Sequence, residues 1–179
     1  MSDPIRPGAV EAIRALKAQN IKLIMLTGDN RLAAEAIAAQ AGIEEVRADL
    51  KPDDKCRTVE ELDQKYGRVA MVGDGVNDAP ALAAAHVGIA MGAAGSDVAL
   101  ETADVALMAD DLSKLPYLFQ FSQRTSHVIR QNLVLSISVI AVLSVAALGE
   151  VLSLPMAVLA HEISEFIVIA SGLRLLRSH

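Results

Sequence analysis

The chain has 179 residues and is 53% hydrophobic, and its 16 Lys and Arg residues against 22 Asp and Glu residues give a net charge of −6. That apolar content exceeds the usual share of about 45–50%, which indicates surface in contact with lipid. Residues 1–116 carry 12 basic and 19 acidic residues, which argues against nucleic acid as a partner, and the lone Cys56 excludes an internal disulfide.

Strand-like and helical segments alternate over residues 1–116. Apolar runs such as Lys22–Leu26 predict strands, and helical spacing that ends at a glycine, as in Arg31–Ala41 before Gly42, predicts helices. This alternation predicts an α/β fold with a Rossmann-like parallel sheet, whose ligands bind beyond the carboxyl ends of the strands. In chain order we expect a helix at 7–19, a strand at 22–26, a helix at 31–41, a strand at 46–50, a helix at 53–66, a strand at 68–72, a helix at 78–85, a strand at 87–91, a helix at 97–101 and a strand at 105–108.

Two short motifs follow the first two expected strands. Thr27, Gly28 and Asp29 come directly after strand 22–26. A hydroxyl and free backbone amides can hold phosphate oxygens there, although Thr27 could instead cap the next helix. Lys55 ends a Lys-Pro-Asp-Asp-Lys run. Its ammonium could neutralise charge on a transferring phosphoryl group, or it could be a solvated surface charge.

The most informative run is Gly-Asp-Gly-Val-Asn-Asp-Ala-Pro-Ala-Leu at 73–82. The carboxylates of Asp74 and Asp78 stand four residues apart, with Asn77 beside the second, after an apolar strand. Magnesium is usually held by one or two carboxylates plus waters and phosphate, and the glycines let the backbone approach a ligand. The alternative is an acidic turn that caps a helix. We favour a magnesium site next to a phosphoryl group.

Residues 117–179 carry two long apolar segments. Leu133–Gly149 has 17 consecutive residues without a charge, and as a helix it would span roughly 25 Å. Val151–Leu173 follows it, and basic residues flank the two outer ends but not the connection near Glu150. The positive-inside rule then places both outer ends, and with them residues 1–130, in the cytoplasm. We expect a stalk and a two-helix transmembrane hairpin, with a buried soluble helix as the alternative for the first segment.

The second apolar segment contains polar residues that could bind a metal: His161, Glu162, Ser164 and Glu165. The imidazole and the two carboxylates fall within an arc of about 100°, and charged groups inside a membrane indicate function. They suit a divalent transition metal such as zinc, cobalt or nickel. Alternatively, the glutamates are solvated near an interface or share a proton. Asn132 and Ser136 of the first segment either contribute to this site or form helix–helix hydrogen bonds.

The three motifs of the soluble half, in this order, resemble the phosphorylation domain of P-type ATPases, within the haloacid dehalogenase superfamily. The continuation at 87–92 and 94–104 looks like the heavy-metal-translocating (type IB) branch. The resemblance covers essentially the whole chain. It implies that Asp74 ligates magnesium and that Asp78, with Asn77 beside it, supports the metal shell.

The same resemblance implies roles for the two upstream motifs. Thr27 and Gly28, in one loop with Asp29, hold the phosphoryl oxygens, and Lys55 balances charge at an aspartyl-phosphate. The implied cofactors are magnesium and ATP, the second only together with domains that this sequence lacks.

The sequence departs from that family in what it lacks. No Asp-Lys-Thr-Gly-Thr segment occurs in the 179 residues, so the carboxylate that the family phosphorylates is missing. The strand that carries it should lie between those of Thr27 and Asp74, and its absence would leave strand edges unpaired. The Asp-Pro-Ile-Arg-Pro run at 3–7 resembles the point where the family's chain returns from the nucleotide domain. We expect the C-terminal part of a pump, completed by its N-terminal remainder and unable to hydrolyse ATP alone.

The transported ion is the least specific part of the resemblance. Cobalt-type pumps have a similar His-Glu-Gly-x-Thr segment in their last helix, but here Ile163 replaces the glycine and Glu165 the threonine; the zinc, cadmium and lead subgroup has an aspartate in this region. The resemblance implies export of a divalent zinc-, cobalt- or cadmium-like cation across the plasma or inner membrane. The alternatives are a non-catalytic, membrane-anchored pseudo-domain with an interaction or regulatory role and, less favoured, a soluble phosphatase.

Overall fold

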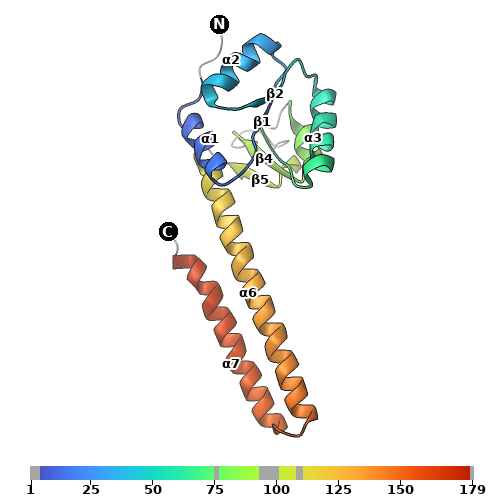
Figure 1. Ribbon diagram of the computed structural model, residues 1–179, viewed down its shortest axis with the longest axis vertical. Coiled ribbons are helices and arrows are strands. Elements are labelled where there is room, and N and C mark those ends of the chain that lie inside the picture. The colour runs from blue at the N-terminus through green and yellow to red at the C-terminus, as the bar shows by residue number, and fades with distance from the viewer. Residues whose placement is uncertain (1–4, 75–76, 93–100, 108–110, 178–179) are drawn as a thin grey trace. The chain divides into compact units, whose positions relative to one another are not determined.

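The computed structural model describes residues 5–74, 77–92, 101–107 and 111–177. The chain divides into two compact units, Met1–Tyr117 and Leu118–His179 (Figure 1). We call the first the soluble unit and the second the membrane unit. Each is described by itself.

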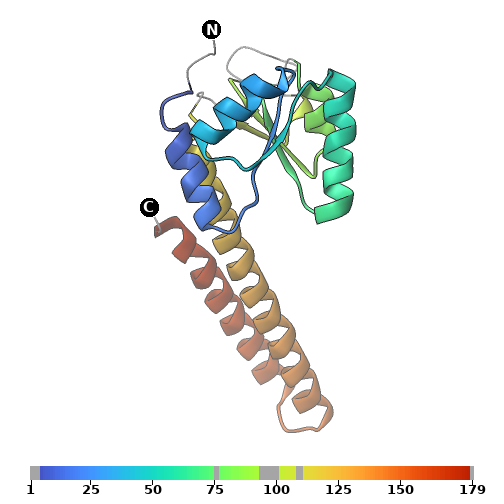
Figure 2. The same ribbon diagram turned by 45° about the horizontal axis from the view of Figure 1, so that its top comes forward.

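The soluble unit alternates helices and strands, as the sequence predicts. In both views the strands lie between α1 and α2 on one side and α3 on the other (Figures 1 and 2). Its elements are α1 (Ala9–Ala18), β1 (Ile24–Leu26), α2 (Arg31–Ala41), β2 (Glu45–Arg47), α3 (Pro52–Tyr66), β3 (Ala70–Gly73), α4 (Ala79–Ala84), β4 (Val87–Met91) and β5 (Val105–Leu107).

The strands form two parallel sheets and not one. β1 pairs with β2, and β3 pairs with β4, which pairs with β5. Among the described strands, β1 and β3 each have a single partner, so each leaves one edge without a ladder. The strands that precede Thr27 and Asp74 therefore belong to different sheets, and we call this break between β1 and β3 the interruption.

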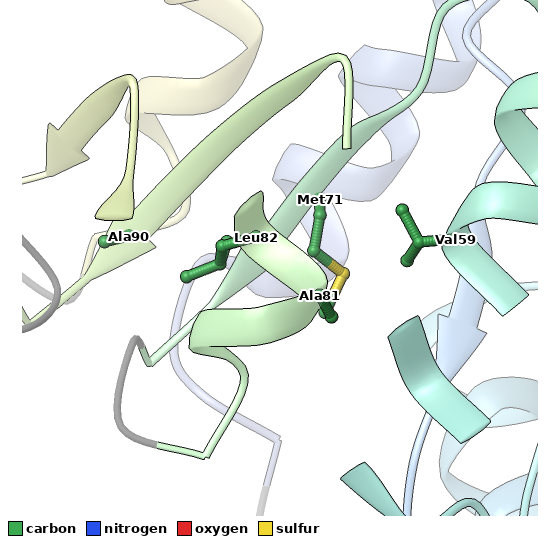
Figure 3. Close-up of a cluster of buried hydrophobic side chains, with 5 residues drawn as sticks. All are labelled: Val59, Met71, Ala81, Leu82 and Ala90. Atoms are coloured by element: carbon green, nitrogen blue, oxygen red, sulfur yellow. The ribbon is translucent and has the colours of Figure 1, made fainter. Parts of the chain in front are cut away.

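Apolar packing bridges this interruption. Val59 of α3, Met71 of β3, Ala81 and Leu82 of α4 and Ala90 of β4 form one buried cluster (Figure 3). Leu26, at the end of β1, packs against the same cluster from the other sheet. Burial of these side chains, and not a hydrogen-bonded ladder, holds the ends of β1 and β3 in one core.

Element boundaries differ from the expected ones where the backbone turns. The strand expected at 46–50 is wrong after Arg47, because Asp49 adopts a φ of 56° and its N–H donates to the carbonyl of Asp29 at 2.8 Å. The helix expected at 7–19 begins two residues late, because Gly8 has a φ of 78°. α2 and its glycine end cap agree with the sequence prediction. The helix expected at 97–101 lies almost entirely outside the described residues.

The membrane unit is a two-helix hairpin. It holds most of α6 (Lys114–Leu148), all of α7 (Leu154–Leu173) and the short 3-10 helix η2 (Arg174–Arg177). Both long helices are long and apolar enough to cross a membrane, with mean hydropathies of 2.1 and 1.5 over their most apolar windows. Almost none of these windows is buried within the protein. The apolar side chains therefore face outward, as lipid contact requires.

Candidate functional site

The Thr27 loop is held by its own polar groups. The Thr27 hydroxyl donates to Asp29 Oδ2 and accepts from the Asp29 N–H, both at 3.1 Å. Helix α2 is capped instead by Asn30, whose Oδ1 accepts from the Ala33 N–H at 3.0 Å. Thr27 therefore does not cap that helix, and its hydroxyl is fixed beyond the carboxyl end of β1.

Backbone contacts join this loop to the start of α3. The Thr27 carbonyl accepts from the Leu50 N–H at 3.1 Å. A Cβ on Gly28 would lie 3.2 Å from the Leu50 carbonyl oxygen, so a side chain there would crowd the contact. Leu50 leads into Lys51, whose N–H donates to Asp54 at 3.2 Å in the first turn of α3. The Thr27 loop and the residues that lead into α3 are thus direct neighbours.

Lys55, in that first part of α3, reaches the acidic motif. Its Nζ lies 2.7 Å from Asp78 Oδ1, and the two side chains are only 18% and 14% exposed. Lys55 is therefore not a solvated surface charge. Asp78 is the N-cap residue of α4, yet its side chain makes no capping hydrogen bond. A short, largely buried charge-assisted bond joins two motifs 23 residues apart.

Gly73 makes room for this pair. A Cβ built on Gly73 would lie 2.8 Å from both Cβ and Oδ2 of Asp78, so any side chain at position 73 would displace that carboxylate. Asp74 follows with an exposed side chain, and its Oδ1 lies 3.4 Å from the Asn77 N–H. Residues 75 and 76, between them, lie outside the described part of the chain.

The donor chemistry of this site fits magnesium. It offers carboxylate oxygens beside backbone that can approach a ligand closely. Within the described residues, no group of three or more His, Cys, Asp or Glu side chains is placed to hold a metal ion. Magnesium does not need such an all-protein cage, since it usually keeps waters and binds phosphate together with one or two carboxylates. Asp74, with Asp78 beside it, is the pair that would hold it.

The polar residues of α7 are only partly brought together. His161 Nε2 lies 3.6 Å from Glu165 Oε1, one turn along the helix. In the described structure His161 Nδ1 is buried and has no hydrogen-bond partner. Ser164 donates its hydroxyl to the His161 carbonyl at 2.7 Å, and Glu162 is exposed. The structure thus pairs two of the four predicted metal ligands.

Asn132 of α6 contacts the other helix of the hairpin. Its Nδ2 donates to the Val168 carbonyl at 3.5 Å. This long hydrogen bond agrees with the helix–helix alternative that the sequence left open for Asn132. It links α6 to α7 close to one end of the hairpin.

Asp104 anchors one strand of the soluble unit, a role that its sequence did not predict. Asp104 Oδ2 accepts from the Gly88 N–H at 2.8 Å and so fixes the start of β4. A Cβ on Gly88 would lie 2.7 Å from the Leu82 carbonyl oxygen, so α4 and β4 meet backbone to backbone. Asp104 directly precedes the expected strand 105–108. No local pattern indicated this contact, because it joins residues 16 positions apart.

A cavity of about 830 Å³ lies away from all these motifs, at the start of β1 and β2. Charged side chains line it, among them Lys22 and Glu45, whose Nζ and Oε2 lie 2.6 Å apart. The hydrogen bond from Lys22 lowers the pKa of Glu45, and the bonds to Glu45 and Tyr66 raise the pKa of Lys22. None of the motif residues lines this cavity. We therefore regard its charged side chains as a surface network of ion pairs and not as part of the candidate site.

Comparison with known proteins agrees with this arrangement. A family model described as a haloacid dehalogenase-like hydrolase matches residues 1–86. A probable cation-transporting ATPase G of Mycobacterium bovis is 53% identical over 96% of this chain, and a zinc-transporting ATPase of Bacillus subtilis is 48% identical over 99% of it. A crystal structure of a zinc-transporting PIB-type ATPase in an E2.Pi state superposes on 98% of the chain with a TM-score of 0.91 and 44% identity.

The fold and the matched model define a haloacid dehalogenase-like domain. More narrowly, the chain is similar over nearly its whole length to one part of heavy-metal-translocating (type IB) P-type ATPases. It spans 22% of the Mycobacterium relative, and 28% of both the Bacillus relative and the solved zinc transporter.

Proposed function

We propose that this chain supplies the magnesium-holding and phosphoryl-holding motifs, and part of the ion path, of an ATP-driven exporter of divalent heavy-metal cations. The observation that carries the proposal is the 2.7 Å contact between Lys55 and Asp78. It joins the motifs after β2 and β3, while backbone bonds join the Thr27 loop to Asp49 and Leu50, just before α3. Such preorganised charge is what phosphoryl transfer requires of a protein.

Each residue has a distinct task in this proposal. Asp74 would hold magnesium, which neutralises phosphate charge when bound, and Asp78 would orient Lys55 and Asn77 around it. The Thr27 hydroxyl and the Gly28 amide, with Asp29 fixing the loop, would hold phosphoryl oxygens. The Lys55 ammonium would balance the negative charge of an aspartyl-phosphate. None of these residues is assigned the role of the nucleophile that attacks phosphate.

The phosphorylated carboxylate would come from a segment outside these 179 residues. The free ladder edges of β1 and β3 support this, because a parallel strand between them would pair both. Its carboxyl end would emerge beside Thr27 and Asp74. In this proposal the soluble unit is completed by the remainder of the pump, and phosphorylation there alternates access to the ion site of the membrane helices.

His161 and Glu165 are the proposed contacts for the transported ion in α7. Their side chains already lie 3.6 Å apart, and an imidazole with a carboxylate suits zinc, cobalt or cadmium-like cations. Glu162 and Ser164 are weaker candidates, because Glu162 forms no ion pair with His161 in the described structure and Ser164 donates to its own helix. The zinc and cation transport named for the relatives supports this choice of cargo.

Incubation with radiolabelled ATP tests the proposal. The chain alone should form no phosphoenzyme, whereas membranes that also contain the N-terminal portion of a related pump should show acid-stable, hydroxylamine-sensitive labelling. Asp74→Asn in this chain should abolish the labelling. No labelling of the combined system would favour the non-catalytic, membrane-anchored pseudo-domain, and phosphate release by the chain alone would favour a phosphatase.

A second variant separates the two halves of the function. In membranes that also contain the N-terminal portion of a related pump, Glu165→Gln should leave phosphorylation from inorganic phosphate intact but change the dependence of ATPase activity on zinc, cobalt and cadmium. An unchanged ion preference would remove Glu165 from the ion path.

A further inference from the structure

A groove of about 490 Å³ lies in the membrane unit between α6 and η2, on the side of the hairpin away from the connection at 149–153. We call this side the open end of the hairpin. One face of α6 forms one wall with residues at i, i+3, i+4 and i+7 spacing, and η2, which continues α7, forms the other. The residues that matter in its lining are Arg124, His127, Val128, Gln131, Arg174 and Leu175.

The groove concentrates positive charge. Among the described residues no carboxylate side chain lines it, and the sequence has no Asp or Glu at 112–149 or at 166–179. Arg174 donates one hydrogen bond to the Ser171 hydroxyl at 3.1 Å. Neither Arg124 nor Arg174 has an ion pair in the described part of the chain. A guanidinium has five N–H donors, so both retain donors for an anion.

The depth of the groove matches the headgroup region of a bilayer. Residues 131–148 of α6 carry no charge, and 18 helical residues span roughly 27 Å, close to a hydrocarbon core of about 30 Å. Arg124 and His127 lie just beyond that stretch, and Arg174 directly follows the last residue of α7. The charged part of the groove therefore lies where phosphate groups of lipids lie.

The walls of the groove are apolar below the charges. Val128 and Leu175 line it, and Val128 stands one turn of α6 beyond Arg124 toward the membrane core. The side chain of His127 is fixed by a 3.0 Å contact between its Nε2 and the Gln131 amide nitrogen. A free anion would leave the apolar walls unused, whereas a phosphate that carries acyl chains would cover them.

We propose that this groove binds the phosphate of an anionic phospholipid, such as phosphatidylglycerol, from the leaflet at the open end of the hairpin. Arg124 and Arg174 bind the phosphate oxygens, and an acyl chain follows Val128 and Leu175 into the membrane. Basic pockets at the ends of membrane helices are suited to this chemistry. The inference requires the hairpin to span a membrane but does not require metal transport.

Native mass spectrometry of the full chain in a neutral detergent tests the site. Phosphatidylglycerol should be retained over phosphatidylcholine, and Arg124→Gln with Arg174→Gln should weaken that retention by about 30-fold, from about fivefold for each arginine. Arg130→Gln removes a similarly exposed charge from α6 outside the groove and should keep the preference. Lys at both groove positions should restore most of it. Far-UV circular dichroism should show the same helicity in all variants.

Several results would overturn the assignment. Equal retention of phosphatidylcholine, or an equal loss of phosphatidylglycerol retention in Arg130→Gln, would show that any surface charge suffices and that the groove is not a specific site. Displacement of phosphatidylglycerol by millimolar inorganic phosphate would make it a site for free anions. Dimers that retain no lipid would show that a second copy of the chain fills the groove.

Discussion

The two units of this chain place the same types of apolar side chain differently, buried in the soluble unit and exposed in the membrane unit. All the buried hydrophobic residues of the described chain lie at or before Leu115, in the soluble unit. In the membrane unit, large apolar side chains such as Leu148, Val151 and Phe166 are 87%, 80% and 70% exposed. An exposed apolar surface of this extent needs lipid or further apolar helices to cover it, so the surroundings of each unit decide which side of a helix is apolar.

The units also differ in how they hold polar groups. In the soluble unit, the bonds from Lys55 to Asp78 and from Gly88 to Asp104 join segments 23 and 16 residues apart. In the membrane unit, the contacts of Ser164 with His161 and of His161 with Glu165 stay within one turn of helix. The phosphoryl site is therefore fixed by tertiary structure, whereas the α7 site is fixed only by helix geometry.

The largest expected effect tests that tertiary bond. Asp78→Ala leaves Lys55 without its partner in a largely buried place, which should lower the free energy of unfolding by about 2–3 kcal/mol. Urea unfolding of the full chain in neutral detergent, followed by tyrosine fluorescence, measures it. Both tyrosines, Tyr66 and Tyr117, belong to the soluble unit.

The matched control is Glu44→Ala, which breaks the 2.6 Å ion pair with Lys17 at a position 89% exposed. It should cost less than about 1 kcal/mol, because water already solvates both charges. Equal losses in the two variants would contradict the view that Lys55 and Asp78 form a buried, structure-determining pair.

Glycine substitutions sharpen the contrast in packing. Gly88→Ala would place a Cβ 2.7 Å from the Leu82 carbonyl, and backbone on both sides cannot yield easily. We expect a loss of about 1–3 kcal/mol in the soluble unit. Gly172→Ala in α7 has no atom within 4 Å of the new Cβ. It should be neutral or stabilising by up to about 1 kcal/mol, because alanine favours helices.

Thermal denaturation of both variants in neutral detergent checks this pair of expectations. Tyrosine fluorescence follows the soluble unit, and circular dichroism at 222 nm follows the helices. A tolerated alanine at position 88 would mean that α4 and β4 are not in close backbone contact.

Sequence patterns predicted the elements well and the contacts between them poorly. Alternating strands and helices, glycine end caps at Gly42 and Gly67, and two apolar spans follow from local chemistry, and the structure has them. The early end of β2 depends on a bond between Asp49 and Asp29, which no local pattern encodes. The interruption between β1 and β3 was predictable only because a specific motif was absent.

The candidate site shows the same division. Residue types and spacing indicated which side chains have phosphoryl chemistry, but two of them, Thr27 and Lys55, had simpler alternatives. Those alternatives were removed by particular contacts, since Asn30 caps α2 and Asp78 pairs with Lys55. In α7, helical spacing indicated one face for three ligands, and the structure pairs only two of them, His161 and Glu165, at 3.6 Å.

A smaller effect is expected for the polar contact between the membrane helices. Asn132→Ala removes the 3.5 Å bond to the Val168 carbonyl, and such bonds in membrane proteins contribute about 0.6 kcal/mol on average. Ser136→Ala, on the same helix, is the control, because the structure records no hydrogen bond for that side chain. Helicity during titration with sodium dodecyl sulfate should separate the two variants slightly. If Asn132→Ala lowered the free energy of unfolding more than Asp78→Ala does, polar contacts would matter more in the membrane unit than in the soluble unit.

The smallest effect concerns the exposed charges of the soluble unit. Hydrogen bonds from Lys17, Lys22 and Ser113 lower the pKa values of Glu44, Glu45 and Asp111, respectively. Their stabilisation is fully present above the unfolded-state pKa values, which are 4.5 for glutamate and 3.8 for aspartate, and is lost as pH falls through the lower folded-state values. The free energy of unfolding, read from tyrosine fluorescence, should therefore decrease as the solution is acidified through this range.

Solvent reaches these side chains, which are 89%, 26% and 40% exposed in Glu44, Glu45 and Asp111, so salt should weaken the effect. The combined variant Glu44→Gln with Glu45→Gln should reduce the loss of stability at acid pH and change the stability at neutral pH little. The pKa of Lys22 is raised by the same partners, so its contribution is present below the unfolded-state value of 10.5 and is lost as pH rises through the higher folded-state value. An acid limb that neither salt nor the double variant changes would place the titrating groups elsewhere. The exposed charge network would then contribute nothing to the difference between the units, and the Lys55–Asp78 contact would be left as the ion pair that distinguishes them.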